Sequence, residues 1–264
     1  MSTSANMSST TRSRRAAFHA EIKATAPPEA LKTLPADPLS KNVPPSIKDL
    51  LSGGASTGGG LLLTNTKYTC RTESVGLTRL QVGFGEDIPR WKKGSVINWA
   101  VRTDGFPTEN HAAYSAYKLN EATVQWNSLD VGVKFKWVDK LEDAAFALGY
   151  GGDGGQTFAE AFFPNGKPLN HLVVYKLSFS PEYLDYQTNI FLHELGHVLG
   201  LRHEFAAREG AGNVLFGPEN QRSVMAYAWP PNIRDSDEDT IRLFYNYTEA
   251  KYQGRPITNY EPDN

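Results

Sequence analysis

The chain contains one cysteine, Cys70, among its 264 residues. A single thiol cannot form an internal disulfide, so we expect a fold that does not depend on oxidation. The sequence also lacks a long apolar run: the longest, GLLLT at 60–64, is far shorter than the roughly 18 residues that a membrane helix needs. These absences predict a protein without a membrane span. They fit a reducing compartment such as the cytoplasm, and secretion by a non-classical route stays open.

A large excess of charge of one sign is also absent. The formal net charge is −2, and no basic stripe runs along the sequence, which argues against nucleic acid as the main partner. The first residues, MSTSANMSSTTRSRRAAFHA, have no apolar segment of the kind that a secretory signal needs. They are typical of a transit peptide or of a solvated disordered tail, and we favour the tail. Neither the compartment nor the oligomeric state follows from this.

Composition divides the chain into a low-complexity part and a domain. The first part is rich in Ser, Thr, Pro, Ala and Gly and includes the linker-like run GGASTGGG. We predict a disordered tail over residues 1–65, a linker or pro-like segment over 66–87, a catalytic domain over 88–250 and a C-terminal tail over 251–264.

The apolar pattern after residue 88 alternates between strand and helix periods. Strands are predicted at 95–103, 133–139, 143–150, 157–163 and 171–177, and helices at 110–129, 188–199 and 236–247. Ser236 and Asp239 would form a capping box in the last helix. The order of elements predicts an α+β fold in which a twisted mixed sheet is backed by two long helices.

Three of the six histidines lie in the short stretch FLHELGHVLGLRHEF. His193 and His197 are one helical turn apart, so both imidazoles project to one point. Gly200 can adopt the left-handed backbone that ends a helix, and such a turn would bring His203 back toward them. Three imidazoles leave the fourth position of tetrahedral zinc open to water, as in catalytic sites. Glu194 is placed to take a proton from that water without being a ligand.

The alternative is a set of core histidines satisfied by ordinary hydrogen bonds. It is the weaker interpretation, because the glycine and the third histidine also stand at fixed offsets. The segment HELGHVLGLRH resembles the extended motif H-E-x-x-H-x-x-G-x-x-H of the metzincin zinc endopeptidases, and Met225 in SVMAY follows it as a Met-turn should. The resemblance implies a metzincin-type zincin fold with an active-site helix, a Met-turn and a C-terminal helix.

The resemblance also assigns roles to residues. It implies one catalytic zinc ion bound by His193, His197 and His203, with Glu194 as general base and then general acid in the hydrolysis of a peptide or protein substrate. Met225 would form an apolar base beneath the histidines, which physically is core packing.

Family features within the clan are mixed. The segments IPRWKKGSVINWAV at 88–101 and GDGGQTFAEAFFPNG at 152–166 look like matrixins, whereas Glu204 and Tyr227 look like astacins. In astacins the matching tyrosine stabilises the oxyanion of the transition state. Tyr227 is therefore expected either to take that role or to pack beneath the cleft.

Two features depart from or extend the matrixin pattern. Matrixin pro-segments fill the fourth zinc position with a cysteine thiolate, and Cys70 lies upstream of the domain. Its surroundings, KYTCRTES, do not match the usual pro-segment motif. This mismatch favours an ordinary free thiol over an inhibitory ligand. Glu160 replaces a histidine of the matrixins' second zinc site, so we expect no such site despite Asp153 and His171. In GYGGDGG a plain loop is favoured over a calcium site.

The strand at 157–163 is expected to border the cleft, where a substrate could add to its edge as an extra strand. Residues 226–231, with the sequence AYAWPP, would line an apolar pocket. Two other functions compete with the peptidase: a catalytically inactive zinc-containing module that binds a peptide or partner, and a small-molecule zinc hydrolase. An open, strand-bordered cleft would favour the peptidase, and a closed pocket the small-molecule enzyme.

Overall fold

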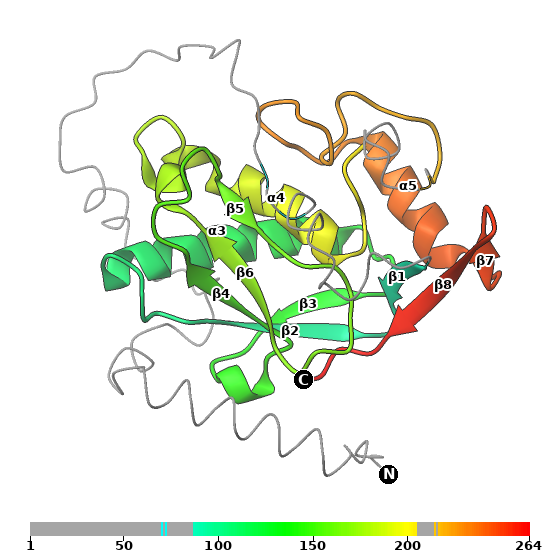
Figure 1. Ribbon diagram of the computed structural model, residues 1–264, viewed down its shortest axis with the longest axis horizontal. Helices are drawn as coiled ribbons and strands as arrows, with labels where there is room; N and C mark the ends of the chain where they lie inside the picture. Colours follow the sequence, from blue (N-terminus) through cyan, green and yellow to red (C-terminus); the bar gives the residue numbers. More distant parts are fainter. Residues whose placement is uncertain (1–69, 71, 73–86, 205–213, 215) are drawn as a thin grey trace.

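The structure is a computed structural model, which describes Cys70, Thr72 and residues 87–204, 214 and 216–264. The predictions for the tail at 1–65, and for most of the segment at 66–87, lie outside these residues. Its main elements are shown in Figure 1: β1 (Ile88–Trp91), β2 (Val96–Val101), α3 (Glu109–Ser128), β3 (Lys134–Trp137), β4 (Phe146–Tyr150), β5 (Ala159–Glu160), β6 (Asn170–Val174), α4 (Gln187–Val198), α5 (Asp235–Asn246), β7 (Lys251–Tyr252) and β8 (Arg255–Tyr260). Three short 3₁₀ turns connect some of them: η2 (Leu141–Asp143), η3 (Lys176–Phe179) and η4 (Leu184–Tyr186).

The larger sheet has five strands in the order β3-β2-β4-β6-β5. The first four are parallel to one another, and β5 is antiparallel to β6 at the edge. Parallel neighbours need a crossover connection, which α3 supplies between β2 and β3. The chain therefore has the predicted α+β architecture with a mixed sheet, and β5 is an edge strand.

The predicted strand at 157–163 is much shorter in the structure, where only Ala159 and Glu160 pair with β6. Before β5, the Phe158 carbonyl still accepts the Tyr175 backbone N–H, and it also accepts the Ser178 hydroxyl. After β5, the Ala161 N–H donates to the Thr72 hydroxyl.

The segment at 251–264, expected to be a tail, contains two strands instead. β8 pairs in parallel with β1, and β7 folds back on β8. The turn between them places Gln253 and Gly254 at φ +48° and +82°, as a two-residue hairpin turn with two left-handed positions requires. The ordered domain therefore extends past residue 250, because β8 covers an edge of β1 that would otherwise be unpaired.

The core lies between the larger sheet and the helices α3 and α4, which lie side by side in Figure 1. Large aromatic side chains fill it, and two of them also fix α4. The indole N–H of Trp126 donates to the carbonyl of Leu192 over 3.0 Å, and that of Trp91 donates to Val198 over 2.7 Å. The second bond satisfies a carbonyl at the end of α4 that has no partner within the helix. The helix that carries His193 and His197 is thus held by the core.

The start of α5 corrects the predicted capping box. The side chain of Asp237, not that of Asp239, accepts the backbone N–H of Arg234 over 2.8 Å. The reason is that the helix begins at Asp235, so Asp237 occupies its third position. Ser236 instead accepts a hydrogen bond from the Asn220 amide.

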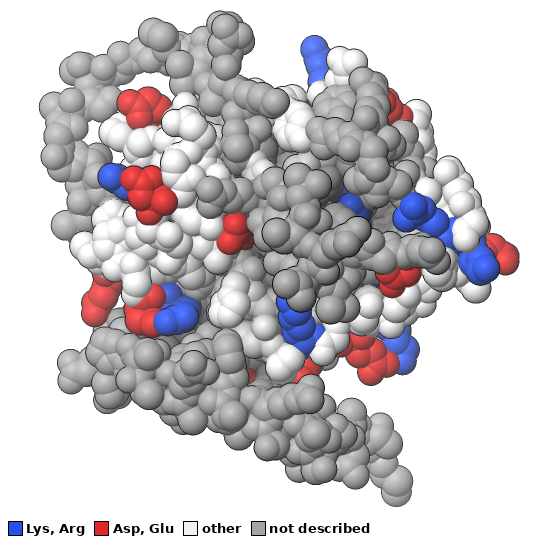
Figure 2. Space-filling view, viewed as in Figure 1, with Lys and Arg blue, Asp and Glu red and all other residues white. Residues whose placement is uncertain are grey.

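Among the helices that the structure describes, none is both long and apolar enough to span a bilayer. On the face shown in Figure 2, the visible lysine and arginine side chains lie among acidic ones.

Candidate metal centre

The end of α4 turns the chain so that the third histidine can return to the first two. Gly200 has φ +97°, a left-handed conformation. Its N–H donates to the His197 carbonyl, and the Leu201 N–H donates to the Gly196 carbonyl. Together these two bonds form a Schellman motif, which closes a helix on a glycine. The chain therefore turns at Gly200, the position where the sequence predicts the turn.

The ring nitrogens of three histidines meet at one point. His193 Nε2 lies 3.2 Å from His203 Nε2, and His197 Nε2 lies 3.3 Å from the same atom. The other nitrogen of each α4 histidine contacts a backbone carbonyl over 2.8 Å: Val224 for His193 and Leu201 for His197. Because a carbonyl only accepts hydrogen bonds, each Nδ1 carries the proton and each Nε2 presents a lone pair.

Several lone pairs directed at one point repel each other unless a cation lies between them. Burial lowers the pKa of both His193 and His197 well below the ordinary value, and the neighbouring histidines lower it further, so the rings are neutral, as metal ligands must be. Zinc with nitrogen ligands at about 2.0–2.1 Å separates two tetrahedral ligand atoms by about 3.3–3.4 Å. The observed spacings of 3.2 and 3.3 Å fit such an ion.

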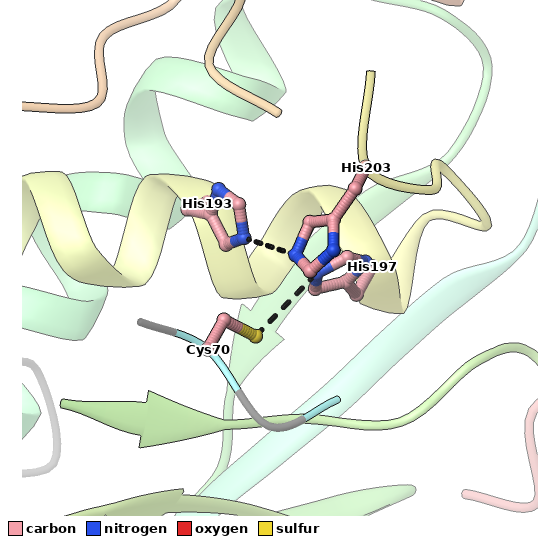
Figure 3. A group of neighbouring side chains, drawn as sticks. All are labelled: Cys70, His193, His197 and His203. Atoms are coloured by element: carbon pink, nitrogen blue, oxygen red, sulfur yellow. Dashed lines mark hydrogen bonds between the residues drawn. The ribbon is translucent and has the colours of Figure 1, made fainter. Parts of the chain in front are cut away.

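Cys70 joins the histidines as a fourth side chain (Figure 3). It is buried, and its Sγ lies 3.6 Å from His197 Nε2. A sulfur ligand at about 2.3 Å and a nitrogen ligand at about 2.0–2.1 Å of one tetrahedral ion would be about 3.6 Å apart. The four ligand atoms all lie within 4.8 Å of one another, so the cluster could hold a metal ion.

Opposing effects act on the pKa of the Cys70 thiol. Burial raises its pKa well above the ordinary value, and the nearby Glu194 carboxylate raises it further, whereas hydrogen bonds with Thr72 act in the opposite direction. A bound cation would reverse the first two effects, because a thiol that coordinates a metal is deprotonated. The sulfur is therefore suited to this place chiefly as a ligand.

Glu194 is fully buried on α4 beside the cluster. Its Oε2 accepts a hydrogen bond from the Thr72 hydroxyl over 2.9 Å and lies 3.5 Å from the Cys70 sulfur. The carboxylate thus faces the same space as the ligand atoms, as the sequence predicts for a general base.

The segment around Met225 supports the histidines from the other side. The Met225 side chain packs directly against Gly196, where a Cβ would overlap with its sulfur. The Met225 carbonyl accepts the Glu204 N–H, so it also holds the loop after the third histidine. The hydroxyl of Tyr227 lies 3.4 Å from Nδ1 of His203, so its contact is with the outer side of that ring.

α5 anchors this supporting segment through one carboxylate. Asp237 Oδ1 accepts from the Ser223 hydroxyl over 2.6 Å, and Oδ2 accepts from the Val224 N–H over 3.0 Å. Val224 supplies the carbonyl that orients His193, so Asp237 acts on the cluster through two intermediates. The sequence gives no signal for Asp237 beyond an acidic helix start, and none for Thr72.

The residues considered for a second zinc site have other contacts. Asp153 accepts the Gly155 N–H and lies 4.0 Å from the Lys176 ammonium. His171 lies on β6, where burial and the nearby Arg102 lower its pKa. Within the described parts of the chain, the Cys70 cluster is the one group of three or more such side chains close enough to share an ion.

The fold and the cluster define a class: an α+β protein whose buried cysteine and three histidines could hold a metal ion. No family model matches the sequence, and no curated protein matches it either.

Proposed function

We propose that this protein is a zinc-dependent endopeptidase with a metzincin-type fold. The observation that carries the proposal is the convergence of three buried imidazoles at zinc spacing, with the Glu194 carboxylate beside them. His193, His197 and His203 would hold the ion. When bound, zinc lowers the pKa of a water ligand toward neutrality and polarises the carbonyl of the scissile bond.

Glu194 would transfer protons in this reaction. Its carboxylate takes a proton from the attacking water and delivers it to the leaving amine. The side chain is fully buried and is carried by a helix that the core fixes, so it needs little reorganisation during the reaction. Tyr227, next to His203, is a candidate for orienting that ring and for stabilising the oxyanion.

The edge strand β5 supports a peptide as the substrate. The structure already places a piece of chain there: Cys70 forms a parallel bridge with Ala159. A backbone can therefore lie along this edge and reach the histidines at the same time. Strand addition to a sheet edge is a common way of binding peptides.

In the proposed enzyme, Cys70 fills the position that water needs. Its sulfur lies 3.6 Å from His197 Nε2 and 3.5 Å from the Glu194 carboxylate. We infer that the described arrangement is a latent form in which Cys70 blocks the site. This supports the inhibitory-ligand interpretation of Cys70 over the ordinary free thiol.

A second function is favoured by the same sulfur. One cysteine and three histidines together form a closed four-ligand set, which is typical of structural zinc sites. The protein would then be an inactive zinc-containing module that binds a peptide or partner. The two functions differ in what Cys70→Ala does: the latent peptidase gains activity, whereas the closed module loses a ligand and gains nothing.

The test is cleavage of a mixed quenched-peptide library by the full-length wild type and by Cys70→Ala. Each protein is measured with zinc, with a chelator, and after zinc is added back. The proposal expects cleavage by Cys70→Ala that chelation abolishes and zinc restores. A zinc-loaded, folded Cys70→Ala protein that cleaves nothing would reject the peptidase and favour the binding module.

A further inference from the structure

Thr72 lies two residues after Cys70 and makes contacts on three sides of the site. Its hydroxyl donates to Glu194 Oε2 over 2.9 Å and accepts the backbone N–H of Ala161 over 2.8 Å. Its own backbone N–H donates to the Cys70 sulfur over 3.3 Å. The side chain is buried, with 6% of its surface exposed.

Two of these contacts engage groups that the proposed reaction needs, and the third engages the inhibitory cysteine. A hydroxyl that donates to Glu194 takes up a carboxylate lone pair, which has to receive the proton of the attacking water. The Ala161 N–H comes directly after β5, so it is a backbone donor near the edge where a substrate carbonyl would bind. The bond to sulfur fixes the cysteine against His197.

We propose that Thr72 is a second inhibitory residue beside Cys70. Its hydroxyl hydrogen-bonds the general base Glu194, and its backbone N–H positions the Cys70 sulfur in the histidine cluster. The inference rests on the proposed function for its meaning, because a blocked base matters only in an enzyme. Its structural content, the docking of Cys70 and Thr72 by the Thr72 hydroxyl, can be measured in the absence of any activity.

The strength of the contact sets the expected effect. Hydrogen bonds to a charged group in a buried site contribute more than those between neutral groups, and losing one corresponds to at least about a tenfold change in an equilibrium. If docking shields the Cys70 sulfur, removing the hydroxyl should raise the population in which the thiol is accessible by that factor.

The experiment measures the rate of Cys70 alkylation by iodoacetamide in the full-length protein, with zinc and with a chelator. Cys70 is the only cysteine of the chain, so the label reports on one site. The variants are Thr72→Val, which keeps the shape and removes the hydroxyl, and Thr72→Ser, which keeps the hydroxyl. Thr123→Val is the matched control, because Thr123 is also buried but donates to the Asn120 carbonyl within α3.

Thr72→Val should be alkylated at least about tenfold faster than the wild type in both conditions, with Thr72→Ser and Thr123→Val close to the wild type. Equal rates for Thr72→Val and the wild type would overturn the inference. So would rapid alkylation of the wild type in zinc, which would mean that the segment is not docked. Thermal unfolding of each variant checks that the faster rate does not come from global unfolding.

Peptide cleavage tests the proposed function separately from the docking of Thr72. In a Cys70→Ala background, Thr72→Val should raise the rate of cleavage further, because it frees Glu194 from its remaining partner in the segment. An unchanged cleavage rate in the double variant would contradict the block of the base. Absence of cleavage in every variant would reject the peptidase, while the alkylation rates would still decide whether Thr72 docks the segment.

Discussion

At the scale of single residues, the site depends on how each ring is oriented. Carbonyls of Val224 and Leu201 hold the Nδ1 atoms of two histidines, which leaves both Nε2 atoms directed at one point. Partners of this kind fix the tautomer of a metal-binding histidine and raise its basicity. The sequence could predict the three histidines and Glu194 from their spacing. It could not predict that the Val224 carbonyl orients His193, because these two residues are 31 positions apart in the sequence.

Replacing Glu194 by Gln should leave the metal in place and remove nearly all turnover. The amide keeps the shape but cannot accept a proton from water at neutral pH. Measurement of bound zinc and of kcat on a cleavable peptide, both in the Cys70→Ala background, checks this. Full activity in the Gln variant would contradict the proposed mechanism.

Tyr227→Phe separates two roles of one hydroxyl. If it only orients His203 Nδ1, from which it is 3.4 Å away, its loss should weaken zinc affinity about 10- to 100-fold. We expect in addition a drop in kcat of the order of 10²-fold at saturating zinc, as for loss of an oxyanion donor. Zinc titration and steady-state kinetics give the two numbers separately. An unchanged kcat at saturating zinc would mean that Tyr227 only orients the metal ligand His203.

At the scale of elements, the centre requires a helix, a sharp turn and a supporting loop to meet. The periodicity of the sequence predicted α3, α4 and α5 to within one residue at each end. It overestimated the strand at 157–163 and missed β1, β7 and β8, because strand pairing depends on distant partners. β8, for example, owes its place to β1, which lies near the start of the domain.

Gly200→Ala should destabilise the protein more than a glycine-to-alanine change at another left-handed position where the new Cβ meets no other atom. A Cβ there would lie 2.5 Å from the carbonyl oxygen of Pro89, in addition to the strain at φ +97°. Gly94→Ala is the matched control, since φ is +92° and nothing lies within 4 Å of its Cβ. The control should cost about 1–2 kcal/mol of unfolding free energy, and Gly200→Ala clearly more. Denaturant titration measures both, and equal losses would refute the clash.

Asp237→Asn tests the support that α5 gives to the loop. The carboxylate accepts from Ser223, Val224 and Arg234, and an amide group would turn one acceptor into a donor facing donors. We expect a loss of about 1–3 kcal/mol in unfolding free energy, together with weaker zinc binding through the displaced Val224 carbonyl. Asp239→Asn, at an exposed position of the same helix, is the control and should change little. Equal effects of the two substitutions would show that Asp237 does not hold the loop.

At the scale of the whole molecule, distant segments assemble one centre. Cys70 and Thr72 reach the cluster from more than a hundred residues upstream, and Asp237 acts on it from the last helix. The local sequence around Cys70 pointed toward a free thiol, because no adjacent motif marks it as a ligand. Its place in the cluster depends on the packing of β5 against α4, because the sulfur lies between these two elements.

The central claim is that one zinc ion is bound by three histidines and capped by Cys70. Zinc X-ray absorption of the full-length protein, with the zinc content measured on the same sample, tests it most directly. The account predicts one zinc per chain, three nitrogen ligands at about 2.0–2.1 Å and one sulfur at about 2.3 Å. In Cys70→Ala the sulfur should be replaced by a light atom while the nitrogens stay. A protein that binds no stoichiometric zinc, or binds it without histidine nitrogens, would contradict the account.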